Sequence, residues 1–536
     1  MPGGKCEKKN KKNEHNYFIE KIFQNTTVNI ILIIIIGLIV CFTHFDEKLS
    51  INGDNAGYIS LGRSILNGEY SYVHIPNSNA HTKFPFGLPV IVALGELFAP
   101  GNFLFTKYII VFLAIGSGLL FYFISRGFFS KFISFLIALF IVINANIVNY
   151  SHQVMTEIPF MFFTLLGFYF FSKRKQKYVF WKDKFLILSL LSFAFSFHFR
   201  TAGITVIMAV LGFLFFDALI NKDKNKWKIF LLSLIIIVLL LAPWQIRSVL
   251  LGGGHSYTTE LLCINPYRPD LGQLDFGSFL DRLKTNFNIY IFSEIPLTIL
   301  TNFKILKNDL SKFVSIIISL FIFGFILIGM VKSYFIKNYR IYTFYSLFYL
   351  GVVFIWAPVW SNIRFILPFV PFFILFLFLG IDTIFNFIKE KRKISISKKS
   401  IFIILIVILF ITNIFGLKLL KKTIRDYPPR WKNYYYCAKW VKMNTEKDVL
   451  ISCRKASLFY LWSDRMAMRY PKTKNTQKVI DGLIKQGVDY VILEQLGFSD
   501  TYRFLYPAMK AHPKYFQSVY HLENPDTYVL KFKKNK

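Results

Sequence analysis

Long apolar runs alternate with short basic or polar stretches along most of this chain. A helix needs about 20 apolar residues to cross a hydrocarbon core of about 30 Å. By that measure the pattern predicts eleven membrane-spanning helices, and therefore a polytopic α-helical membrane protein. The predicted spans are residues 27–44, 102–124, 130–148, 154–172, 184–198, 201–219, 228–247, 312–331, 341–358, 363–385 and 400–418.

The distribution of lysine and arginine predicts the orientation of these spans. Two short loops that we expect outside, residues 149–153 and 358–362, contain neither residue type, whereas the loops expected inside are basic. Positive residues are retained on the cytoplasmic side of a membrane. We therefore expect a multi-pass protein of the cytoplasmic (inner) membrane, with its N-terminus in the cytoplasm and its C-terminus outside.

Composition supports this class and excludes others. Of the 536 residues, 54% are hydrophobic and 62 are phenylalanine, which is more apolar surface than a soluble domain can bury. The net charge of +34 fits orientation signals and contact with anionic membrane lipids, so we expect no nucleic-acid partner. Five scattered cysteines without a CxxC pair predict neither a disulfide framework nor a thiolate metal site.

The same pattern divides the chain into three parts. We expect a basic cytoplasmic N-terminus over residues 1–26, a transmembrane domain over residues 27–426 and an extracytoplasmic domain over residues 427–536. Two outer loops, residues 45–101 and 248–310, interrupt the transmembrane domain. Loops of that length are uncommon unless they have a function.

The C-terminal part has a different hydrophobic pattern from the rest. Residues 448–453, 490–494 and 527–532 have the apolar character of short strands, and residues 476–486 have the period of an amphipathic helix. Strands that alternate with a helix predict a small α/β domain.

Two acidic residues lie where predicted spans meet the outer face. Asp54 follows the first span, and Glu157 lies at the outer start of the fourth. Each could simply stabilise a helix N-terminus, Asp54 as the N-cap of an interfacial helix over residues 56–66 and Glu157 through the helix dipole. Ionisable groups at a membrane edge also favour a functional reading. We therefore treat both as candidate catalytic residues.

Several cations lie at the same face. Arg200, Arg247 and Arg364 fall near outer ends of predicted spans, where the positive-inside rule disfavours them, and Lys83 lies in the first outer loop. Single arginines at such positions can extend to lipid headgroups. Together they predict an anion site, because the guanidinium fork matches phosphate oxygens.

The first outer loop also contains Tyr58 and His81, which we assign to substrate binding. His74 or His81 could hold a divalent metal together with Asp54, although loop histidines are more often simply solvated. We assign no metal ligand, and no cofactor is required by the sequence.

Carboxylates and cations at the edge of a bilayer suit a substrate that joins a phosphate to a long apolar tail. A sugar linked to polyprenyl phosphate has that form. Asp54 would act as a general base on an acceptor hydroxyl, and the cations would stabilise the departing phosphate. The predicted function is transfer of a sugar to a lipid, glycan or protein acceptor on the outer face of the membrane.

Several short motifs follow one another along the chain in a characteristic order and spacing. They are Asp54 with Tyr58, Leu66-Asn-Gly68, Lys83-Phe-Pro85 with Pro89, Thr156-Glu157, Phe199-Arg200 with Gly203, Pro243-Trp-Gln-Ile-Arg247, and Arg364-Phe-Ile-Leu-Pro368 with Pro371.

This order and spacing resemble those of the C-type (GT-C) glycosyltransferases. The resemblance covers residues 20–390 and is strongest to the bacterial branch with lipid A aminoarabinose transferases and relatives of protein O-mannosyltransferases. It implies the GT-C fold, catalytic roles for Asp54 and Glu157, and phosphate contacts from Lys83, Arg200, Arg247 and Arg364. Asn55 stands where many members have a second acidic residue.

Two other functions remain open on the sequence alone. A flippase or transporter for lipid-linked glycans would place ionisable groups near the bilayer midplane and often shows internal repeats. An O-antigen ligase or polymerase would also use outer arginines. Its main functional residues would then lie in the loop of residues 248–310, and Asp54 would not be the central residue.

Overall fold

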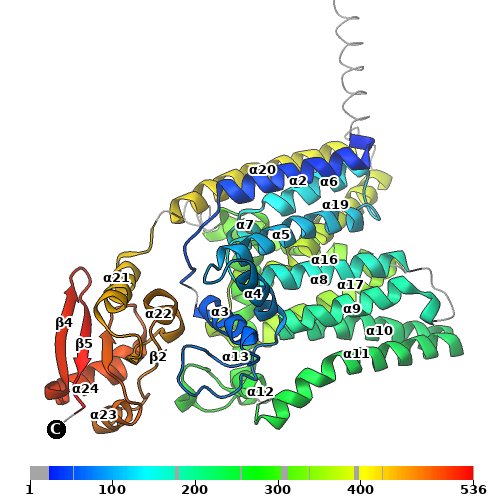
Figure 1. Cartoon of the computed structure of the whole chain (residues 1–536). Coiled ribbons are helices and arrows are strands. Elements are labelled where there is room, and N and C mark those ends of the chain that lie inside the picture. Colours follow the sequence, from blue (N-terminus) through cyan, green and yellow to red (C-terminus); the bar gives the residue numbers. More distant parts are fainter. Residues whose placement is uncertain are drawn as a thin grey trace, which may run out of the picture.

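The computed structural model describes residues 23–51, 53–174, 180–253, 256–303, 312–336, 339–391, 397–424 and 426–534. Long helices lie side by side in one body, and a small sheet domain adjoins one end of it (Figure 1). Most of the predicted N-terminal segment, residues 1–26, lies outside the described residues.

Each of the eleven predicted spans coincides with a helix or a helix pair. By length and composition, seven helices of the described residues can cross a membrane, or eight if the pair α6–α7, bent by 50°, forms one span. The remaining predicted spans form α8, α9 and α17, of 17, 16 and 16 residues. The span helices are α2 (Thr26–Thr43), α5 (Leu104–Ser125), α6 (Lys131–Ile143), α7 (Ala145–Ser151), α8 (Glu157–Lys173), α9 (Lys184–Phe199), α10 (Ile204–Asn221), α11 (Lys224–Leu250), α16 (Lys312–Phe335), α17 (Arg340–Ile355), α18 (Ile363–Ile366), η7 (Leu367–Phe369), α19 (Val370–Lys391) and α20 (Lys398–Thr423).

The two long loops are largely helical. In the first, α3 packs against α4, and an ion pair between Arg63 and Glu96 joins these two helices at 2.9 Å. The prediction that residues 56–66 form an interfacial helix is wrong in one respect. Tyr58 and Leu61 of α3 are buried, so this helix does not present its apolar side to a membrane surface. The loop helices are α3 (Gly53–Leu66), α4 (Gly87–Phe98), η2 (Thr201–Gly203), α12 (Ser256–Leu262), α13 (Phe276–Ile289), the π-helical η4 (Tyr290–Glu294) and α14 (Ile295–Ile299).

The C-terminal part forms a mixed five-stranded sheet with the order β2-β1-β3-β5-β4. Strands β2, β1 and β3 are parallel, whereas β5 pairs antiparallel with β3 and β4. The three predicted strands and the predicted helix are present, and β2, β4, α21 and α22 were not predicted. The elements are α21 (Pro429–Asn444), β1 (Ile451–Ser452), α22 (Ala456–Ser463), β2 (Ala467–Met468), α23 (Thr476–Lys485), β3 (Tyr490–Leu493), η8 (Thr501–Leu505), α24 (Tyr506–Ala511), β4 (Phe516–Leu522) and β5 (Thr527–Phe532).

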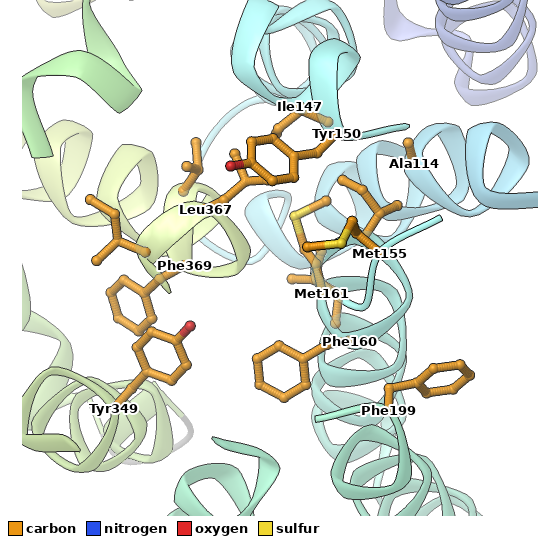
Figure 2. Close-up of a cluster of buried hydrophobic side chains, with 14 of the residues drawn as sticks. Ala114, Ile147, Tyr150, Met155, Phe160, Met161, Phe199, Tyr349, Leu367 and Phe369 are labelled. Carbon is orange, nitrogen blue, oxygen red and sulfur yellow. The ribbon is translucent and has the colours of Figure 1, made fainter. Parts of the chain in front are cut away.

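A cluster of buried side chains fixes the helices that carry the acidic and basic candidates. Phe160 of α8, Tyr349 of α17 and Phe369 of η7 face one another in this cluster (Figure 2). The ring of Tyr349 stacks on both phenylalanines, with centroids 6.2 Å and 5.3 Å apart. Phe160 follows Glu157 by one turn, and Phe369 follows Arg364 by five residues, so this packing sets where those two charged side chains lie.

Helices α16 and α19 cross at two glycines, which allow their backbones to approach closely. A Cβ atom on Gly329 would lie 1.9 Å from the carbonyl oxygen of Phe376, and one on Gly380 would lie 1.9 Å from that of Phe325. Small residues at such crossings are a common means of packing helices in membranes.

Gly380→Ala is therefore expected to force the two helices apart and to lower stability by about 1–3 kcal/mol. The measurement is the thermal unfolding midpoint of the purified protein in detergent. Gly324→Ala, on the partner helix α16, is the matched control, because no neighbouring atom of the described residues lies within 4 Å of its Cβ position. Alanine favours a helix over glycine, so the control should unfold at an equal or higher temperature. Equal midpoints for both variants would contradict the close crossing.

Candidate active site

Four charged side chains from distant parts of the chain meet in one cluster. Arg364 donates from Nη1 to Oδ2 of Asp54 at 2.7 Å and from Nε to Oε1 of Glu157. Arg200 donates from Nη1 to the same Oε1 atom of Glu157 at 2.5 Å. The cluster therefore contains two carboxylates and two guanidinium groups, and Arg364 bridges the two acids.

Solvent access increases across this cluster from one acid to the other. The side chain of Glu157 is 0% exposed, that of Arg364 is 23% exposed and that of Asp54 is 38% exposed. A buried carboxylate is stable only when it is well paired, and two arginines supply the pairing for Glu157. Asp54 is paired on one oxygen and remains accessible to a solute.

The local sequence explains how these groups are presented. Asn362 caps α18 by accepting a hydrogen bond from the backbone N–H of Arg364 at 2.9 Å, which fixes the first turn of that helix. Helix α3 begins at Gly53, so Asp54 lies inside its first turn and not at the expected N-cap of a helix over residues 56–66. Tyr58 lies one turn later on the same face and is buried.

Lys83 and Arg247 form a second group beside the first loop. Lys83 pairs with Glu260 of α12. Arg247, near the end of α11, donates to the carbonyl oxygen of His81 at 2.8 Å and lies over the rings of Tyr70 and Trp244. The four predicted cations therefore divide into two pairs, Arg200 with Arg364 and Lys83 with Arg247.

His81 contacts the backbone of its own loop. Its Nε2 atom accepts a hydrogen bond from the backbone N–H of Phe84 at 2.9 Å. Burial, with Lys83 and Arg247 nearby, lowers the pKa of His81 to about 4, so the ring is neutral at neutral pH. Its predicted role in substrate binding remains a prediction.

Tyr257 of α12 lies between the two groups, and the sequence did not reveal it. Lys83 Nζ lies 5.3 Å from the centre of its ring. Burial raises the pKa of Tyr257 to about 12, and the charges of Arg200, Glu260 and Asp54 all act on its hydroxyl. The length of the second outer loop predicted that residues 248–310 have a function, but no pattern distinguished this tyrosine from others in the loop.

The donor set at Asp54 and Glu157 does not fit a divalent metal. Both carboxylates are already bound to the guanidinium of Arg364, whose positive charge would repel a cation. In the described part of the chain, no three histidine, cysteine, aspartate or glutamate side chains converge in a metal-binding geometry.

One family of known sequences matches part of the chain. Residues 87–246 match the model of the dolichyl-phosphate-mannose-protein mannosyltransferases. This stretch contains Glu157 and Arg200 and ends one residue before Arg247. No curated protein matches the sequence significantly.

Solved structures of two enzymes share the fold. ArnT from Cupriavidus metallidurans bound to undecaprenyl phosphate is 10% identical, with a TM-score of 0.57 over 94% of this chain and 98% of that one. An Archaeoglobus fulgidus oligosaccharyltransferase tethered to an acceptor peptide is 12% identical, with a TM-score of 0.55 over 95% of this chain and 74% of that one. The expected GT-C fold and its small C-terminal α/β part are thereby confirmed, and the chain is a multi-pass membrane protein with the fold of the C-type glycosyltransferases.

Glu157→Gln is expected to lower stability by about 3–5 kcal/mol, because Arg200 and Arg364 then lose the charge that compensates them in a buried position. Thermal unfolding in detergent measures the effect. The matched control is Glu260→Gln, which breaks the more exposed pair with Lys83 and should change stability by about 1 kcal/mol or less. Equal effects of the two substitutions would show that the Glu157 cluster is not buried as described.

Proposed function

We propose that this protein is a glycosyltransferase that moves a sugar from a polyprenyl-phosphate carrier to an acceptor hydroxyl. The observation that carries the proposal is the accessible Asp54 carboxylate, held by Arg364 beside a fully buried second acid. The fold, shared with ArnT and an oligosaccharyltransferase, supports this reading over a transporter. The acceptor is a lipid, a glycan or a protein.

In the proposed reaction Asp54 is the general base. It takes the proton of the acceptor hydroxyl as that oxygen bonds to the anomeric carbon of the sugar. The bond between this carbon and the phosphate oxygen breaks, and polyprenyl phosphate leaves with the electron pair. Arg364 positions the carboxylate, because its hydrogen bond occupies Oδ2 of Asp54. Glu157 acts one step further away, by holding Arg364 and Arg200.

Lys83 and Arg247 are the proposed contacts of the donor phosphate. Neither of these two cations forms an ion pair with Asp54 or Glu157 among the described residues. Tyr257 lies near both Lys83 and Asp54. Cations at this position stabilise the charge that develops on the leaving phosphate. Arg200 and Arg364 would act on the donor mainly through the field of the cluster.

The proposed site faces the outside of the cytoplasmic membrane. The basic loops predicted to be cytoplasmic join the ends of the span helices opposite to Asp54, so the positive-inside rule places the four-residue cluster at the outer surface. The donor is then a lipid-linked sugar, which a polyprenyl carrier presents at that surface.

Asp54→Asn is expected to reduce sugar transfer by at least about 100-fold, because the amide cannot accept the proton. The rate of transfer from a polyprenyl-phosphate sugar is measured at matched protein levels, with thermal unfolding as a check on folding. Asparagine keeps an oxygen that can accept from Arg364, so the fold should remain intact. The control is Asp275→Asn at the N-cap of α13, which should retain full activity. Full activity of Asp54→Asn would remove this residue as the base.

Arg247→Ala is expected to raise the KM for the donor by roughly 10- to 100-fold, since one charge-assisted phosphate contact contributes about 1.5–3 kcal/mol. Arg247→Lys should recover only part of the loss, because lysine lacks the planar fork. Arg268→Ala removes an exposed arginine from the outer loop that follows α11 and should leave the KM unchanged. If Arg247→Ala and Arg268→Ala behave alike, Arg247 does not contact the donor.

A further inference from the structure

The C-terminal domain reaches the proposed base directly. Helix α22 packs against α3, and the two lie beside each other at the junction of the domains (Figure 1). The backbone N–H of Ala467 donates to the carbonyl oxygen of His74 at 2.8 Å, and the ring of Tyr460 lies 6.2 Å from that of His74. The first outer loop and the end of the chain therefore form one surface next to Asp54.

Three cations of the C-terminal domain lie at this junction. Arg454 pairs with Asp500 at 2.9 Å, and it shares the ring of Phe498 with Lys455, each cation 4.6 Å from the ring centre. Lys455 and Arg469 have no ion-pair partner among the described residues. Two of the three cations at the junction are therefore not held in an ion pair by the part of the chain that the structure describes.

Another acid of this domain does not neutralise that charge by contact. Glu494 is buried and accepts hydrogen bonds from the backbone N–H of Leu496 and the hydroxyl of Thr501. Burial raises the pKa of Glu494, which favours its neutral form. Neither of these hydrogen bonds of Glu494 involves Lys455 or Arg469.

Lys455 immediately precedes α22, which packs against the helix that carries Asp54, and the charges of these two residues interact. Burial, followed by the charges of Arg454 and Arg469, lowers the pKa of Lys455 to about 8, while Asp54 and Glu494 act in the opposite direction. The charges of Asp54 and Arg469 also act with opposite sign on Tyr72, whose pKa is raised chiefly by burial. Asp54 consequently has one group of cations on the membrane-domain side and another on the C-terminal side.

A row of rings leads from the C-terminal domain to one of the proposed donor contacts. The ring of Tyr72 lies 5.1 Å from that of His74 and 4.8 Å from that of His81. His74 contacts the C-terminal domain, and the carbonyl oxygen of His81 accepts a hydrogen bond from Arg247. Arg247 thus lies at the His81 end of this row and the C-terminal domain at its His74 end.

We propose that Lys455 and Arg469 bind an anionic group of the acceptor, a phosphate or a carboxylate, and so hold the reacting hydroxyl at Asp54. This inference rests on the proposed function, because it assigns the second substrate of the same site. It makes the acceptor a negatively charged molecule. An arginine fork and a lysine on one side of the site suit such a group, and the described residues form no ion pair with either cation.

The test uses the full-length protein in detergent, saturated with undecaprenyl phosphate to occupy the donor site. Inorganic phosphate and, separately, acetate are then titrated while the thermal unfolding midpoint is followed. At least one of these anions should stabilise the wild-type protein saturably. The double variant Lys455→Ala with Arg469→Ala should need at least about tenfold more anion for the same stabilisation, since each lost charge-assisted contact contributes about 1.5–3 kcal/mol. Its affinity for undecaprenyl phosphate should change less than about twofold.

The matched control is the double variant Lys478→Ala with Lys485→Ala, which removes two exposed lysines of α23 in the same domain. It should respond to the anions as the wild type does. The proposal is overturned if neither anion stabilises the wild type saturably. It is also overturned if the anions stabilise both double variants equally. Loss of undecaprenyl phosphate binding in the Lys455 and Arg469 variant would assign these residues to the donor instead. Failure of the wild type to bind undecaprenyl phosphate would count against the proposed donor, while the anion titration would still report on this pair.

Discussion

The shared hydrogen bonding of Arg364 to two carboxylates is the interaction on which this architecture depends. Glu157 is completely buried, and an unpaired carboxylate in that position would be prohibitively unstable. Two arginines compensate its charge. Arg200 immediately precedes η2, and Arg364 lies in the first turn of α18. Because Arg364 also holds Asp54, the placement of α3 is tied to the same network.

In this network one acid, Glu157, is buried and held rigidly, whereas the other, Asp54, is accessible to solvent. Solvent does not reach the side chain of Glu157, and the stacked rings of Phe160 and Tyr349 fix the helix that begins at this acid. The accessible acid lies at the boundary between the transmembrane helices, the first loop and the C-terminal domain. The proposed role of Asp54 as a base benefits from this arrangement, because Arg364 fixes the orientation of the carboxylate while its other oxygen remains accessible.

Hydrophobic pattern was sufficient to predict the helices, since span length and apolar composition depend on the bilayer and not on distant contacts. The sequence predicted that Arg200 and Arg364 form part of a site for a phosphate. In the structure both arginines pair with the protein's own carboxylate, Glu157, and the sequence did not predict this pairing. Burial of Tyr58 was missed, because a period of apolar residues does not say whether lipid or another domain covers them. Tyr257, Lys455 and Arg469 were missed because their significance depends on tertiary neighbours.

The contact between Arg364 and Asp54 joins residues 310 positions apart in the chain. Most of the transmembrane helices are therefore synthesised between the proposed base and the arginine that orients it. The junction with Ala467 comes later still in the chain. During biosynthesis α3 must remain beside the membrane without its eventual partners until these segments have been synthesised. A chain truncated before the C-terminal sheet would contain the proposed base but lack one wall of its surroundings.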